Sequence, residues 1–388
     1  MAAEGPVCPA AAVEVVDAAG LTRDTFASQY INQPRGAPVV LRGACADWGW
    51  FASHRSALYD GRDPTELDTL LPPPSQWASR LAALVGTDVL GAGEAWELDY
   101  GGDGGSGPSD CAATDLGPIT VQRFVELLRP TATAAAGEAL GRNKLHYMQW
   151  RGLPTPLQQA ELEQELRARD QSAATHPAKR HRTDAAVPEQ RSDTEPEAAG
   201  VREREASDGL LKFLGMLGPA SLVDPSSVRE RNVWAGRCVT SRIHFDGLDN
   251  LHYVLAGRKR VRLWSPWDTA SLAPRGVQQL PVESLAGSSL APDLVKAPRF
   301  LEADMYEAVV QPGDAIFIPA GWWHEVSTNE PSHSASDPDP AARPPWLPVP
   351  PSSGALSVNV WFDAHISTAA RSQARRRPAL VYLRALSH

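Results

Sequence analysis

The amino-acid sequence predicts a mainly β protein, an antiparallel sandwich or barrel with a helical wrap supplied by its N-terminal part. Between residues 232 and 365, short apolar runs alternate with Gly and Pro, a spacing that is typical of antiparallel strands. Helical patterns fall mainly in the N-terminal third, so we expect the helices to cover the outside of the β structure. The predicted strands are NVWAG, VTSRIHFD, LHYVLAG, RVRLWSP, MYEAVV, AIFIPA, WHEVS and ALSVNVWF.

The N-terminal region, residues 1–167, is expected to support this barrel. Residues 38–42 and 146–150 have the apolar pattern of short buried strands. Residues 119–129 fit an amphipathic helix, and Pro156 begins another helix, because proline is favoured at the first helical position. The residues of this second helix that are expected to face inwards are Leu157, Leu162 and Leu166.

Two stretches lack any periodic apolar pattern. Residues 168–208 are rich in Ala, Thr, Arg, Glu, Asp and Pro, which predicts a disordered insertion. Its basic cluster at 179–182 is interpreted as part of a solvent-exposed charged loop, with a nuclear localisation signal as the alternative. Residues 331–354 hold eight prolines between two strand signals, which predicts a lengthened surface loop. The barrel core is therefore assigned to residues 209–365, and a C-terminal tail to residues 366–388.

Length, charge and cysteine content narrow the class of protein. A single barrel domain can use all 388 residues, and the net charge of −9 provides no overall positive field for nucleic acid or anionic membrane. The four cysteines are widely spaced and form no CxxC pair, which favours reduced thiols in a cytoplasmic or nuclear protein. No apolar run reaches the roughly 18 residues that span a bilayer, and the N-terminus lacks a signal-peptide pattern. We therefore expect no membrane association.

One set of polar residues predicts a metal site. His244 and Asp246 lie two positions apart in a predicted strand, where alternate side chains point to the same face. A His-x-Asp pair alone is weak, and His324 alone is as readily a core histidine as a ligand. However, His324 follows a buried strand and a bend at Pro319 and Gly321 that aims it inwards. Together the three residues predict a two-histidine, one-carboxylate site, which suits non-haem Fe(II) because three coordination positions stay open.

Another histidine, His252, also lies on a predicted strand. Its neighbours are apolar, so it is interpreted as a packed core histidine and not as a metal ligand. His146 and His365 are interpreted in the same way.

Three segments carry a resemblance to a known family. They are HFDGLDNLHYVLAGRKRVRLWSP, PGDAIFIPAGWWHEV and SVNVWF. They resemble the JmjC-domain hydroxylases, in particular the cupin-8-like group that includes the tRNA wybutosine hydroxylase and the asparaginyl hydroxylase of hypoxia-inducible factor. The resemblance is close over residues 210–330 and 355–365 and loose over 30–150. It implies a double-stranded β-helix (a jelly-roll or cupin barrel), with Fe(II), 2-oxoglutarate and O2 as cofactor and cosubstrates.

The resemblance also implies roles for individual residues. Lys259 takes the position of the lysine that pairs with the distal carboxylate of 2-oxoglutarate, and a buried carboxylate does need a charged partner. The hydroxyl position beside it corresponds to Ser241, with the adjacent Thr240 as the alternative. Further cosubstrate-binding positions correspond to Tyr147, Asn250 and Asn359, and substrate-facing positions to Gln149 and Trp361. A core or barrel-lining role is the alternative for Tyr147, Gln149 and Trp361.

The function implied by the resemblance is that of a 2-oxoglutarate-dependent dioxygenase, with release of succinate and CO2. The substrate is expected to be a protein side chain or a modified tRNA base, and N-demethylation after hydroxylation is a further option. Two other classes stay open: a catalytically inactive JmjC/cupin metal-binding interaction module, and a zinc-type cupin isomerase. Several relatives dimerise through a long helical tail, and only about 27 residues follow Trp361 here. A homodimer is therefore an open expectation.

Overall fold

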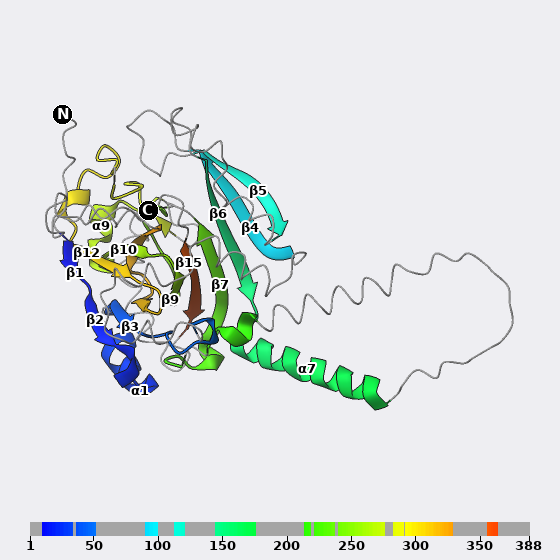
Figure 1. Cartoon of the computed structure of the whole chain (residues 1–388). Helices are drawn as coiled ribbons and strands as arrows, with labels where there is room; N and C mark the ends of the chain where they lie inside the picture. Colours follow the sequence, from blue (N-terminus) through cyan, green and yellow to red (C-terminus); the bar gives the residue numbers. More distant parts are fainter. Residues whose placement is uncertain are drawn as a thin grey trace, which may run out of the picture.

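The computed structural model describes the following parts of the chain: residues 10–33, 36–51, 90–99, 112–120, 144–175, 213–218, 221–236, 240–275, 282–290, 292–328 and 355–363. Two sheets make up most of this structure (Figure 1). One has six strands in the order β1-β12-β10-β14-β8-β11, and the other has nine in the order β2-β3-β13-β9-β15-β7-β6-β4-β5. Strands distant in sequence lie side by side in both sheets, and most pairs are antiparallel, as a jelly-roll requires.

The strands are β1 Ala10–Ala12, β2 Glu14–Asp17, β3 Val39–Arg42, β4 Leu90–Asp99, β5 Ala112–Thr120, β6 Lys144–Leu153, β7 Val228–Gly236, β8 His244–Phe245, β9 Asp249–Ala256, β10 Lys259–Trp264, β11 Val282–Glu283, β12 Met305–Val310, β13 Ala315–Ile318, β14 Trp323–Thr328 and β15 Ala355–Phe362. The α-helices are α1 Arg23–Phe26, α7 Pro156–Thr175 and α9 Thr269–Leu272. Short 3-10 turns include Gly49–Phe51, Pro266–Asp268 and Phe300–Glu302.

The inner faces of the two sheets share an apolar core. Val254 and Ile316 of the nine-stranded sheet are fully buried in one cluster with Val261 and Leu263 of the six-stranded sheet. Residues that pair directly across a ladder project to the same side, so this cluster identifies the inner face of every paired strand. The polar side chains of the candidate site project from the same strands onto this inner face.

Described residues of the N-terminal segment pack against the outer face of the nine-stranded sheet. Trp48 packs against Tyr253 with ring centroids 4.7 Å apart, and Phe26 packs edge-on against Phe317 at 5.2 Å. The indole N–H of Trp50 donates to a carbonyl of β9 at 3.2 Å, which satisfies its buried polar atom. These aromatic residues fix β9 and β13, the two strands that face the six-stranded sheet from the other side of the core.

Three sequence expectations about secondary structure need correction. The amphipathic helix expected at 119–129 does not begin at Ile119, which with Thr120 ends strand β5; residues 121–129 lie outside the described structure. Helix α7 begins at Pro156 as predicted but continues to Thr175, past the expected start of the insertion at 168. The rest of that insertion, residues 176–208, is outside the described structure. The run VTSRIHFD forms only the two-residue strand β8 and an isolated bridge at Thr240.

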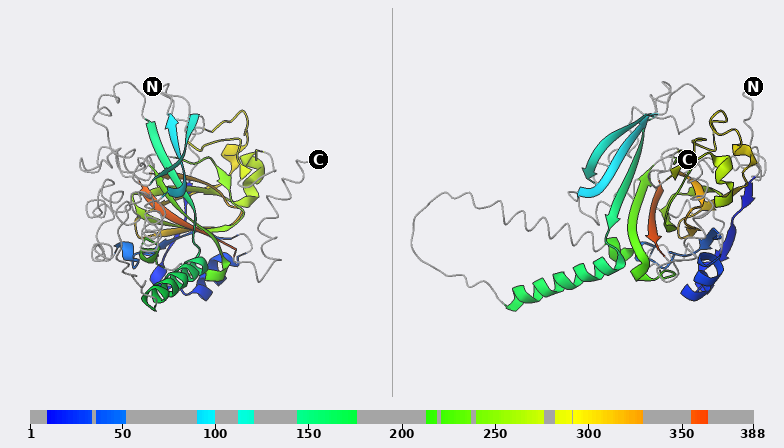
Figure 2. Two further views of the ribbon diagram at one scale, coloured as in Figure 1. Left: turned by 90° about the vertical axis from the view of Figure 1, so that its right-hand side faces the viewer. Right: turned by 180° about the vertical axis from the view of Figure 1, so that it is seen from behind.

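Helix α7 is also more exposed than predicted. Leu157 is 53% exposed and Leu162 is half-buried, while the side chain of Leu166 lies outside the described residues. Figure 2 shows α7 directed away from the two sheets, so the sheets give most of its length no apolar surface. Among the described helices, none has the length and apolar composition needed to cross a membrane.

Candidate metal centre

The three predicted ligands meet at one end of the inner face. His244 and His324 are direct partners across β8 and β14, and their rings lie 4.3 Å apart between centroids. Asp246 follows β8, and its carbonyl accepts a hydrogen bond from the amide of Gly321 at 2.9 Å. Gly321 has a φ of 84°, which permits the bend after Pro319 that precedes His324. The same bend therefore positions both Asp246 and His324.

The distances agree with a shared metal ion. His324 Nε2 lies 3.6 Å from Asp246 Oδ2, and one ligand atom from each of the three residues lies within 4.8 Å of the others. Two ligands that each bind a metal at about 2.1 Å are at most about 4.2 Å apart, so the 3.6 Å pair can bind one ion. Among the described residues, these three form the one such group of His, Cys, Asp and Glu.

Both imidazoles are oriented for coordination through Nε2. His244 Nδ1 lies 2.7 Å from the carbonyl oxygen of Arg242, and His324 Nδ1 lies 3.0 Å from that of Trp322. A carbonyl only accepts, so each Nδ1 carries the proton and each Nε2 keeps its lone pair. Burial, followed by the neighbouring His244, lowers the pKa of His324 to about 4, which keeps this imidazole neutral at physiological pH. Two neutral imidazoles and one carboxylate are the donor set of a facial Fe(II) site.

Lys259 lies on the same face as His324 and is buried, 2% exposed. Direct pairing of β10 with β14 places Lys259 opposite Thr328 and Leu263 opposite His324. The Lys259 ammonium donates to Thr328 Oγ1 at 2.7 Å, and no carboxylate in the described parts of the chain forms an ion pair with it. Burial lowers the pKa of Lys259 to about 7. A buried ammonium without a counter-charge is costly, so this position suits an anionic ligand.

Thr328 is a residue of this site that the sequence analysis missed. It follows His324 by four positions on β14, so strand alternation from His324 through Val326 to Thr328 could have identified it. The neighbouring Arg260 projects to the opposite face, where it is buried in an ion pair with Glu307.

The geometry favours Ser241 over Thr240 as the hydroxyl beside the site. Thr240 Oγ1 donates at 3.1 Å to Ser327, whose hydroxyl lies on the outer face near Arg262. The neighbouring Ser241 is anchored to the inner-face residue Val326, because its Oγ accepts the amide of Val326 at 3.0 Å. The hydroxyl proton of Ser241 remains available to a ligand.

The remaining predicted residues come from the nine-stranded sheet. Across β15 and β9, Asn359 pairs with His252 and Trp361 with Asn250, while Ile316 of the inner core also pairs with His252. These four polar side chains therefore project into the barrel. Asn359 Oδ1 accepts the indole N–H of Trp234 at 2.8 Å. Within the described structure, Asn250 Oδ1, His252 Nε2 and Trp361 Nε1 are buried without a hydrogen-bond partner.

The last two predicted site residues, Tyr147 and Gln149, lie on β6, which pairs with β7 in the nine-stranded sheet. The register of β6 with β7 places Tyr147 opposite Gly236 and Gln149 opposite Trp234. The side chains of Tyr147 and Gln149 lie outside the described residues, so their roles remain predictions.

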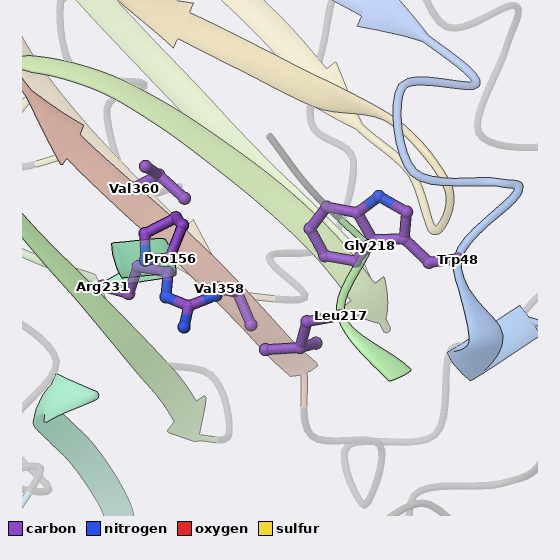
Figure 3. A pocket seen from close by; sticks show the side chains of 7 residues that line it. All are labelled: Trp48, Pro156, Leu217, Gly218, Arg231, Val358 and Val360. Atoms are coloured by element: carbon purple, nitrogen blue, oxygen red, sulfur yellow. The ribbon is translucent and has the colours of Figure 1, made fainter. Parts of the chain in front are cut away.

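A small pocket elsewhere in the molecule is not a second candidate (Figure 3). Its volume is about 10 Å³, room for at most one water molecule. It lies against the outer face of the nine-stranded sheet, because Val358 and Val360 alternate with the inward-facing Asn359. The Arg231 guanidinium there already donates to the carbonyl of Pro154 and, at 3.0 Å, to Gln159. The lining residues are Trp48, Pro156, Leu217, Gly218, Arg231, Val358 and Val360.

Comparison with known proteins identifies relatives that match part of this chain. An HSPB1-associated protein 1 homolog of Danio rerio is 37% identical over 109 residues, which is 26% of this chain and 24% of that protein. Lysine-specific demethylase 8 of Danio rerio is 41% identical over 112 residues, which is 27% of this chain and 26% of that protein. The tRNA wybutosine-synthesizing protein 5 of Homo sapiens is 39% identical over 89 residues, which is 22% of this chain and 26% of that protein. The chain thus spans about a quarter of the length of these relatives.

The solved structure of E. coli ycfD covers 95% of this chain and 59% of its own, with 11% identity and a TM-score of 0.35, too low to bear on the fold. The family described as "Cupin-like domain" matches residues 141–368, more than half of the chain, and includes both strands that supply the metal ligands. JmjC proteins are among the relatives. This protein therefore belongs to the cupin-like, JmjC-type domain family.

Proposed function

We propose that this protein is an Fe(II)- and 2-oxoglutarate-dependent dioxygenase that hydroxylates a protein side chain or a modified tRNA base. The observation that carries this proposal is the buried Lys259, which has no carboxylate partner among the described residues and lies on the same barrel face as the three candidate metal ligands. A metal ion explains the ligands but not the lysine. A metal-chelating ligand with a second, anionic end accounts for both, and 2-oxoglutarate has this chemistry.

Two groups of residues bind the two ends of the cosubstrate. At one end, His244, Asp246 and His324 hold the metal. The backbone carbonyls that accept hydrogen bonds from the Nδ1 atoms of His244 and His324 orient the Nε2 atom of each imidazole towards it. Lys259 and the Ser241 hydroxyl hold the distal carboxylate. When bound, iron and 2-oxoglutarate would activate O2: one of its oxygen atoms would enter the succinate formed as 2-oxoglutarate loses CO2, and the other would enter the substrate as a hydroxyl. The apolar inner core keeps the site dry.

Two substrate classes remain in the proposal, and the relatives include proteins named for both. One relative is named a lysine-specific demethylase and another a tRNA wybutosine-synthesizing protein. The motif phrase DNL…GRKRV favours the tRNA reaction, whereas the net charge of −9 favours a protein substrate. Both belong in one screen.

The competing functions predict different behaviour. An inactive interaction module has no need of a buried ammonium, since replacing Lys259 by an apolar residue would stabilise it. A zinc-type isomerase would turn over without 2-oxoglutarate or O2. Neither class accounts for the pairing of the metal triad with Lys259.

The test is succinate formation by the full-length, Fe(II)-loaded protein against a tRNA pool and a peptide pool, with mass spectrometry for the gain of one oxygen. We expect one pool to stimulate succinate release, and His244→Ala and Asp246→Ala to lose at least about a hundredfold of it. Glu302→Gln changes an exposed side chain that pairs with Arg299, so it serves as the control and should retain activity. Equal succinate release by wild type and both ligand variants would refute the proposal.

A further inference from the structure

His252 lies at the centre of β9 and faces the barrel interior, but the interpretation as a packed core histidine leaves part of it unexplained. It pairs with Ile316 on one side and Asn359 on the other, and its side chain is 6% exposed. Its Nε2 has no hydrogen-bond partner in the described structure. Buried polar atoms in proteins almost always have a partner, so an unmatched nitrogen on a ligand-facing surface calls for one.

His252 lies within electrostatic range of both Lys259 and the candidate metal ligand His324. Its cross-strand partners Ile316 and Asn359 place it on the inner face of the barrel. It is not part of the group of residues that can share a metal ion. Burial, followed by these two neighbours, lowers the pKa of His252 to about 3, and a neutral imidazole offers one N–H donor.

We infer that His252 is a further hydrogen-bond donor to the distal carboxylate of 2-oxoglutarate, acting beside Lys259 and Ser241. This inference rests on the proposed function. A carboxylate has about four acceptor sites, and the Lys259 ammonium, which is shared with Thr328, and the single hydroxyl of Ser241 cannot fill them all. A neutral donor adds a hydrogen bond without adding a second buried positive charge next to Lys259.

The neighbouring residue provides a matched control. Tyr253 is equally buried but projects to the opposite face, where it packs against Trp48. A change at Tyr253 alters the same strand and the same core without reaching the inner face. The effects of a His252 substitution on strand packing can therefore be separated from effects on the ligand.

The experiment is calorimetric titration of the full-length chain loaded with Mn(II), which replaces Fe(II) without supporting turnover. Each protein is titrated with 2-oxoglutarate and with 2-oxobutyrate, which has the same metal-chelating end but no distal carboxylate. We expect His252→Phe to weaken 2-oxoglutarate binding about tenfold or more, the usual loss for a hydrogen bond to a charged group, and to leave 2-oxobutyrate binding unchanged. His252→Gln, which keeps a donor, should restore most of the affinity, and Tyr253→Phe should bind both ligands like wild type.

Each outcome separates this inference from the proposed function. Unchanged 2-oxoglutarate binding in His252→Phe overturns the inference and leaves the proposed function standing. Equal weakening of both ligands also overturns it, because the effect would then lie at the metal end. If wild type binds no 2-oxoglutarate, the proposed function fails, and the inference with it. Should His252→Phe not fold, His252→Leu, a smaller apolar replacement, provides the same comparison.

Discussion

On the outer face of the six-stranded sheet, Arg260 and Arg262 meet Glu307 at 2.7 and 3.1 Å, and Arg262 also meets Glu325 at 3.2 Å. Lys259 lies on the inner face of β10, the strand that also carries Arg260 and Arg262. Among the described residues, its ammonium contacts only the hydroxyl of Thr328. All of these cations are buried. The difference indicates that charges matched within the chain hold the sheet together, whereas the charge left unmatched is available to a ligand.

The ion pairs on the outer face also include a residue of β14, the strand that carries His324. Glu325 follows His324, and its carboxylate accepts from the Ser288 hydroxyl at 2.6 Å and the Ser289 amide at 3.0 Å. The segment that contains these serines is joined to β8, because the carbonyl of Gly287 accepts the amide of Ile243 at 2.9 Å. Glu325 thus connects β14 to the segment that follows β11, on the face opposite the three candidate metal ligands.

The largest effect on stability is expected from Glu325→Ala. This change leaves Arg262 with one fewer buried carboxylate and removes the acceptor of Ser288 and Ser289. We expect the free energy of unfolding to fall by about 3–5 kcal/mol, as when one partner of a buried ion pair is deleted. Urea denaturation measures it, with the exposed Glu302→Ala as a control that should change stability by less than about 0.5 kcal/mol. If the free energy of unfolding fell by a similar amount in the two variants, buried ion pairs would contribute no more to stability than surface ion pairs, contrary to this account.

The opposite result is expected on the inner face for Lys259→Met. We expect the metal-free protein to become more stable by about 1–3 kcal/mol, because a buried charge without a counter-charge is removed. Binding of 2-oxoglutarate to the metal-loaded variant should weaken at least about a hundredfold. Denaturation and calorimetry measure the two quantities, with the exposed Lys296→Met as the control. Destabilisation by Lys259→Met would mean that the lysine belongs to the fold.

The pH dependence of stability should distinguish the same two faces. The pKa of Lys259 is lowered from 10.5 to about 7, so between these values the unfolded chain binds a proton that the folded protein does not. Stability of the metal-free protein therefore rises with pH over this window, by up to about 1.4 kcal/mol per pH unit. Urea denaturation at pH 7 and 9, with wild type compared to Lys259→Met, isolates this contribution. An identical pH slope in the two proteins would contradict it.

The smallest effect is expected for the two adjacent hydroxyls. Ser241→Ala should weaken 2-oxoglutarate binding by about three- to tenfold, the loss of one hydrogen bond. Thr240→Val should leave binding unchanged, since Thr240 donates to Ser327 on the outer face. Calorimetry on the metal-loaded proteins compares them. A larger loss in Thr240→Val would reverse the assignment made from the geometry.

Local sequence patterns were sufficient to predict most strands of the barrel core and the three residues that lie together as a group that could hold a metal ion. The run before His324 is apolar and bounded by turns, so its conformation depends mainly on nearby residues. The run around His244 is more polar and forms only the two-residue strand β8. Contacts between distant strands were not predictable. Alternation along β14 places Thr328 on the same face as His324, but the contact of Thr328 with Lys259, like that of Glu325 with Ser288, depends on register that no local pattern specifies.

Helix α7 shows a different reason for failure. Its leucines suggested an inward face, but the sheets offer little surface along it, and Leu157 remains exposed. His252 was correctly predicted to be buried, yet burial alone did not reveal that its Nε2 would lack a partner. The tail at 366–388 lies outside the described structure and stays a prediction, and the homodimer stays an open expectation.

The most direct test of the account is the metal dependence of 2-oxoglutarate binding, measured by calorimetry on the wild-type chain with and without Mn(II). If the triad and Lys259 form one site, the metal-loaded protein binds 2-oxoglutarate with a single-site isotherm, and both metal removal and His324→Ala abolish that binding. Absence of binding to the metal-loaded wild type, or binding that is equally tight without metal, would contradict it.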